Sequence, residues 1–134
     1  MAILGKITAE VLVDGQALQE YEDDGIENEN PDLVVKYIEA TSGANFHIRV
    51  SILDSFKITS DAVSLEVYLD GNNVENVTPY NHQISKPDSP FCYLFRGSET
   101  KGDEGWSRQA FLFSEITRSM CLYCRDDIHC LSIS

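Results

Sequence analysis

Phe46-His47-Ile48-Arg49-Val50-Ser51-Ile52 alternates apolar and polar side chains, and this stretch decides the fold class. Successive side chains of a β-strand point to opposite faces, so a period of two predicts a strand with one buried face. Residues 7–13 and 63–69 repeat the pattern, with apolar side chains at their odd-numbered positions. We therefore expect three half-buried antiparallel strands whose apolar faces point into one core.

Turn residues directly follow two of these strands. Asp14-Gly15 comes after the first, and Asp70-Gly71 comes after the last. Asp and Gly tolerate the positive φ angles of a two-residue type I′ turn, so each dipeptide predicts a tight β-hairpin. The two turns would oppose Val11 to Leu18 and Val67 to Val74.

A third hairpin is predicted between residues 33–40 and the central alternating strand. Thr41-Ser42-Gly43 fits a three-residue hairpin loop with the glycine in the left-handed conformation. This register would pair Ile38 with Phe46 on the core side and Tyr37 with His47 on the outer side.

The spacing of strands and turns predicts an all-β fold, a single antiparallel β-sandwich that is immunoglobulin-like or jelly-roll-like, with about seven to nine short strands. A closed barrel is the alternative. We expect residues 1–116 to form the sandwich and residues 117–134 to form a cysteine-containing tail.

Further expectations concern the second half of the chain. Residues 91–95 form an apolar run that predicts a strand buried on both sides, with Cys92 as a small buried side chain. Residues 97–105 predict a flexible turn. Trp106 is expected to fill the core, and a platform for stacking is the alternative. Residues 107–113 predict a further strand, and a short helix is the alternative.

Charge limits the classes of partner. The 134 residues carry 22 acidic and 10 basic side chains, a formal net charge of −12. Nucleic acids and anionic lipids select basic surfaces, so neither is an expected partner, whereas a protein with a basic surface is. Seven of the acidic residues lie within residues 20–32, which predicts an exposed, mobile loop.

The expected compartment is the cytoplasm or the nucleus. The first residues contain no signal-like apolar segment, and the longest apolar run is far shorter than the roughly 20 residues that span a bilayer. The four cysteines are then expected to be thiols.

The search for chemistry finds no nucleophile elbow, zinc-protease helix or phosphate-binding loop, so we expect a protein that is not an enzyme and needs no cofactor. Tyr37, His47 and Arg49 would share one outer sheet face that could bind an anion or a sugar. An ordinary polar outer face is the alternative.

A second group of polar residues lies near the C-terminus. Cys121, Cys124, His129 and Cys130 are residue types that zinc accepts. However, His129 and Cys130 are adjacent, and no second pair of closely spaced cysteines completes the site. We therefore expect ordinary thiols rather than a metal centre.

The segment Tyr37-Ile38-Glu39-Ala40-Thr41-Ser42-Gly43-Ala44-Asn45-Phe46-His47-Ile48-Arg49-Val50 resembles a fungal family of uncharacterised small proteins. Shorter stretches at residues 10–16, 67–71 and 111–116 extend the resemblance over about residues 5–116. It implies a fungal source, and it implies no activity and no functional residues.

Together these features predict a non-enzymatic binding module whose partner is another protein. The alternative is a lectin-like domain for a small ligand or carbohydrate, with Tyr37, His47 and Arg49 in the site.

Overall fold

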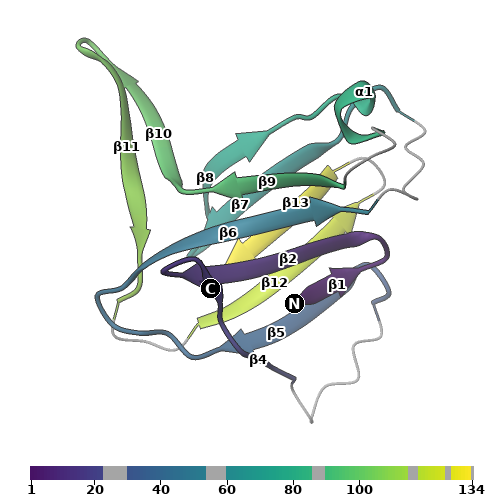
Figure 1. Cartoon of the computed structure of the whole chain (residues 1–134), viewed down its shortest axis with the longest axis horizontal. Helices are drawn as coiled ribbons and strands as arrows, with labels where there is room; N and C mark the ends of the chain where they lie inside the picture. The colour runs from purple at the N-terminus through teal and green to yellow at the C-terminus, as the bar shows by residue number, and fades with distance from the viewer. Residues whose placement is uncertain (23–29, 54–59, 86–89, 115–117, 126–127, 134) are drawn as a thin grey trace.

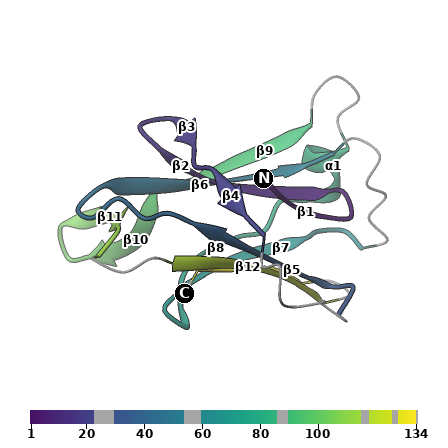
Figure 2. The same ribbon diagram turned by 90° about the horizontal axis from the view of Figure 1, so that it is seen from below.

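Two β-sheets packed face to face form the body of the molecule, as two views at right angles show (Figures 1 and 2). The structure is a computed structural model that describes residues 1–22, 30–53, 60–85, 90–114, 118–125 and 128–133, the last two ranges by their backbone. The all-β sandwich predicted from the sequence is confirmed, and neither sheet closes into a barrel.

The first sheet has the order β1-β2-β6-β11-β10, with β3 paired to β2 and β9 paired to β6. All its pairs are antiparallel. Its strands are β1 (Ala2–Leu4), β2 (Ile7–Val13), β3 (Gln16–Ala17), β6 (Asn45–Ile52), β9 (Phe91–Phe95), β10 (Gly97–Gly102) and β11 (Gly105–Leu112).

The second sheet has the order β4-β5-β12-β13-β7-β8. Its pairs are antiparallel except that of β13 with β7, which is parallel. Its strands are β4 (Glu20–Tyr21), β5 (Leu33–Ile38), β7 (Ser64–Leu69), β8 (Asn72–Val77), β12 (Arg118–Arg125) and β13 (Ile128–Ile133). One short helix, α1 (Asn81–Ile84), follows β8.

The core lies between the sheets and follows the predicted alternation. The even-numbered side chains of β6 are at most 3% exposed, and the odd-numbered side chains of β2 and β7 are buried or packed against the core. Phe46 also stacks on Phe113, with ring centroids 4.3 Å apart. The prediction that alternate side chains of these three strands face the core is therefore confirmed.

Both predicted type I′ turns are present. Asp14 and Asp70 have φ angles of 50°, and the glycine after each also has a positive φ. The first hairpin has the expected register, because the Leu18 amide donates to the Val11 carbonyl at 2.8 Å. The second register was wrong by one residue: a β-bulge places Val67 opposite Glu75 instead of Val74.

The third predicted hairpin was wrong. β5 pairs with β4 and β12 in the second sheet, whereas β6 belongs to the first sheet. Gly43 has the expected positive φ of 76°, but its amide donates to the Phe113 carbonyl at 3.0 Å in a turn that crosses between the sheets. The alternation of apolar side chains does not show whether β5 and β6 are neighbours in one sheet or lie in facing sheets, because in both cases their inward side chains meet in the same core.

Two other expectations need correction, and the expected domain boundary stays a prediction. β9 is not buried on both sides: Cys92 lies on the face opposite the buried Phe95 and is exposed. Tyr93 shares the face of Phe95 but is still 36% exposed. Residues 97–102 form β10 rather than a flexible turn. The boundary expected at residue 116 lies outside the described residues, and the expected tail supplies β12 and β13.

The described residues form thirteen strands, more than expected, because these C-terminal strands and several short strands join the sheets. In this part of the chain, no helix combines the length and the apolar character that crossing a bilayer requires.

We predict that Ile48→Ala lowers the free energy of unfolding by about 2–5 kcal/mol, because it leaves a cavity at a side chain that is 0% exposed. Ile3→Ala is the matched control, since Ile3 lies in the same sheet and is 53% exposed; its effect should stay within about 0.5 kcal/mol. Urea unfolding curves measure both, and equal losses would contradict the assignment of the core.

Candidate functional site

The structure separates the residues that the sequence placed in one polar site. His47 and Arg49 lie on β6, on the outer face of the first sheet. Tyr37 lies on β5 in the second sheet, opposite Tyr21 of β4. The prediction that Tyr37 shares a sheet face with His47 and Arg49 depends on the third hairpin, which the structure does not contain.

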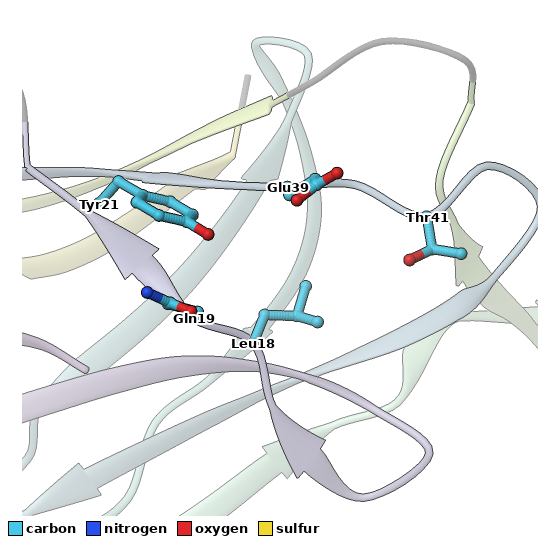
Figure 3. Close-up of a pocket in the computed structure, with 5 residues that line it drawn as sticks. All are labelled: Leu18, Gln19, Tyr21, Glu39 and Thr41. Carbon is cyan, nitrogen blue, oxygen red and sulfur yellow. The ribbon is translucent and has the colours of Figure 1, made fainter.

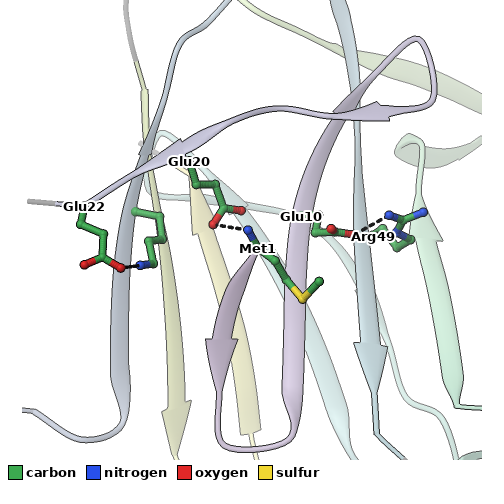
Figure 4. A network of polar contacts seen from close by, with 6 residues as sticks. Met1, Glu10, Glu20, Glu22 and Arg49 are labelled. Carbon is green, nitrogen blue, oxygen red and sulfur yellow. Dashed lines mark hydrogen bonds and ion pairs between the residues drawn. The ribbon is translucent and has the colours of Figure 1, made fainter.

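Arg49 is engaged by a carboxylate from the neighbouring strand. Its Nε donates to Oε2 of Glu10 at 2.8 Å, and the two residues lie directly opposite each other in the β2–β6 ladder (Figure 4). Opposite charges on facing strands stabilise a pair in this way. The guanidinium group of Arg49 is therefore held in an ion pair between β2 and β6. His47, on the same strand, is half-buried.

The register of β12 and β13 divides the cysteine and histidine candidates. Cys124 lies opposite His129, whereas Cys121 lies opposite Ser132 and Cys130 lies opposite Tyr123. Neighbouring positions of a strand alternate between faces, so the register assigns these four residues to two faces. Among the residues whose side chains the structure describes, no group of three or more His, Cys, Asp or Glu is placed to hold a metal ion.

One pocket was not foreseen from the sequence. It has a volume of about 370 Å³ and lies between the chain that links β3 to β4 and the chain that follows β5 (Figure 3). Its side chains offer hydroxyl, amide and carboxylate groups that could hydrogen-bond a small polar molecule. They are Leu18, Gln19, Tyr21, Glu39 and Thr41.

The start of the acidic segment is held by ion pairs. Glu20 is 6% exposed at its side chain, and its Oε2 lies 2.7 Å from the amine of Met1 (Figure 4). Glu22 pairs with Lys36, and this hydrogen bond, with the charge of the ammonium group, lowers the pKa of Glu22. The exposed loop expected at residues 20–32 therefore does not begin at Glu20; residues 23–29 lie outside the described residues.

The largest departure from the sandwich is the β10–β11 hairpin, which projects from the body (Figure 1). Phe95 of β9 pairs with Ile48 of β6, and Phe111 of β11 pairs with Phe46. β9 and the end of β11 thus occupy neighbouring positions along the same edge of β6. The residues between them, 96–110, extend beyond β6 and project from the body as a two-stranded hairpin (Figure 1), and we call this segment the arm.

Gly97 allows the chain to turn from β9 into the arm. It is buried and lies opposite Ala110. A Cβ atom at this position would lie 2.3 Å from the carbonyl oxygen of Gln109, closer than any side chain tolerates. Glycine is therefore a steric requirement for the close approach of the two strands at the base of the arm.

The arm exposes an indole ring. Trp106 is 72% exposed, so its predicted place in the core was wrong. It lies opposite Lys101, and Arg108 lies opposite Glu99. Arg108 Nε donates to Glu99 Oε1 at 3.0 Å, and this hydrogen bond and ion pair raise the pKa of Arg108.

Beyond Ser98, every residue of the arm up to Ala110 is exposed, so the arm adds nothing to the core. Large aromatic side chains usually lie in cores or at interfaces, where burial of their apolar area is favourable. Trp106 and Arg108 belong to the residue types that most often dominate binding energy. The arm is therefore the described feature best suited to recognition.

The chain is thus a two-sheet β-sandwich with a projecting hairpin that exposes Trp106. The chain belongs to the DUF7918 family, a domain of unknown function, whose model matches residues 6–120. This match confirms the resemblance to a family without an assigned function, and the fungal source stays a prediction. No curated protein and no solved structure matches the chain.

We predict that Gly97→Ala destabilises the protein by about 1–3 kcal/mol and loosens the arm, because the added methyl group collides with main chain. Gly102→Ala is the matched control on the same strand, since its nearest contact would be 3.9 Å away. Thermal unfolding and amide hydrogen exchange of residues 98–110 measure the two effects. Equal behaviour of the two variants would contradict the close approach at Gly97.

A titration tests the Glu22–Lys36 pair. The lowered pKa of Glu22 means that the pair stabilises the fold above the ordinary pKa of a glutamate, and that this contribution disappears as the pH falls through the lowered value. NMR detection of the Glu22 carboxyl should show the lowered pKa, and Lys36→Met should return it to the ordinary range. An unchanged pKa in that variant would show that Lys36 is not its cause.

Proposed function

We propose that this protein is a non-enzymatic binding module whose partner is another protein, and that the arm is its main contact. The observation that carries the proposal is the exposure of Trp106 on a hairpin outside the core. An exposed indole ring gains free energy when a partner covers it, because its apolar surface leaves water. The Gly97 contact fixes the base of the arm, which limits the ordering cost of binding.

The charge of the chain supports a protein partner with a basic surface. A net charge of −12 repels nucleic acid phosphates and anionic lipid headgroups, and it attracts a positively charged protein. Such long-range attraction raises the association rate. The contact that a partner makes with the indole ring of Trp106 would set the lifetime of the complex.

The second candidate function is binding of a small ligand or carbohydrate. The pocket of about 370 Å³ favours it, because its hydroxyl, amide and carboxylate groups match the chemistry of a sugar. Tyr37 lies in the second sheet and His47 and Arg49 lie in the first, so the proposal is argued from the pocket and not from these three residues. Loss of glycan-array binding in Glu39→Ala, but not in Arg49→Ala, would favour the pocket.

Affinity capture from lysate of the cells that make the protein tests the main proposal. We expect a specific protein on immobilised wild type, and loss of at least about tenfold of its signal with Trp106→Ala, as for a binding hot spot. Tyr80→Ala is the matched control, because Tyr80 is also aromatic and is 56% exposed but lies beside α1, away from the arm. Equal capture by all three forms would overturn the role of the arm.

A further inference from the structure

We infer that the arm binds an extended segment of a basic partner by strand addition along the outer edge of β11, with Trp106 packed on an apolar side chain of that segment. This inference rests on the proposed function and specifies the kind of partner and the mode of contact. It starts from the main-chain groups of the arm rather than from its side chains.

The two edges of the arm differ. On the β10 edge, the main-chain N–H of Glu99 donates to Oε2 of Glu75, which belongs to β8 of the other sheet, at 3.1 Å. The β10 edge is therefore in contact with β8 of the second sheet. In the described part of the chain, β11 between Gly105 and Ala110 pairs with β10 alone, and Figure 1 shows β11 on the outer side of the arm.

The hydrogen-bond pattern shows which groups this outer edge presents. In an antiparallel ladder, pairs that exchange N–H···O bonds alternate with pairs whose N–H and C=O groups point outward. The Glu99 amide points to Glu75 and so away from β11, which makes Glu99–Arg108 an outward pair. The pair two positions on, Lys101–Trp106, is then outward as well.

Trp106 and Arg108 therefore direct their main-chain N–H and C=O groups to the outer edge of β11. Unpaired groups in a row along a strand are a template for another strand. Their side chains share one face of the arm, because they are two residues apart. A strand added here would gain main-chain hydrogen bonds and place a side chain against the indole ring of Trp106.

Charge selects the occupant. A second copy of the chain carries the same net charge of −12, so long-range repulsion opposes the approach of two copies. The basic side chain on the docking edge, Arg108, is already paired with Glu99. Asp103 and Glu104 form the exposed turn before Trp106, where a basic side chain of an added strand would find two carboxylates. An extended basic segment would pair with the carboxylates of the turn, and an aromatic or β-branched residue in it would pack on the indole ring of Trp106.

Two phage-displayed heptapeptide libraries test the inference on the full chain. One library carries Lys at alternate positions, the other carries Glu at the same positions, and the remaining positions are random. We expect binders from the Lys library alone, enriched in aromatic or β-branched residues. Failure of the Lys library, or equal success of the Glu library, would overturn the inference.

Arg108→Pro and Arg108→Ala then separate main chain from side chain, with Kd measured by fluorescence anisotropy of one selected peptide. Both variants remove the guanidinium, but only proline removes the outward N–H. We expect Arg108→Pro to bind about fivefold to tenfold more weakly than Arg108→Ala, the value of one lost main-chain hydrogen bond. Equal affinities of the two variants would contradict strand addition.

N-methylation of the selected peptide, one residue at a time, gives a readout that does not depend on the fold of any variant. Strand addition predicts that methylation at alternate residues weakens binding, because only every second N–H faces β11. Absence of alternation would overturn strand addition, even if capture still depends on Trp106 and so supports the proposed function. A dimer of the chain that Arg108→Pro dissolves would show that the occupant is a second copy and would overturn the basic segment.

Discussion

The packing of the apolar faces of β2, β6 and β7 between the two sheets is the constraint on which the rest of the structure depends. β6 is at the centre of it, because every second side chain from Phe46 to Ile52 is buried. It pairs with β2 along one side, and on the other side with β9 and then with the end of β11. These pairings fix both ends of residues 96–110 at adjacent positions of β6. The segment between them therefore extends beyond β6 as a hairpin, which is the arm.

Much of the fold could be predicted from local sequence. The period of two identified the buried faces of β2, β6 and β7, and Asp-Gly identified both type I′ turns, because alternation and positive φ are properties of short segments. Strand partners could not be predicted in the same way. Ile38 and Phe46 both point inward, yet they lie in different sheets, and parity is the same for partners within a sheet and for residues that meet across the core.

The candidate site was harder to predict than the fold. The grouping of Tyr37 with His47 and Arg49 depends on one wrong strand pairing. The prediction that Trp106 fills the core is wrong as well, because the general preference for burying large aromatic rings does not show which ring is buried. A signal for the arm was present between Gly97 and Gly105: the segment is bounded by glycines and contains no apolar side chain, so neither of its faces could join the core. Such a segment is typical of a two-stranded ribbon outside the body, and any large aromatic residue beside it is then exposed.

The central claim is that the arm stands away from the core and presents one unpaired edge of β11. Amide hydrogen exchange of the full chain, read by NMR residue by residue, tests this claim most directly. Slow exchange should alternate along β11, with Ser107 and Gln109 protected by β10 and with Trp106 and Arg108 exchanging fast, while Ile48 and Val50 in the core of the first sheet exchange slowly. Protection of Trp106 and Arg108 equal to that of Ser107 and Gln109 in the isolated monomer would show that the edge is already covered, and would contradict the account.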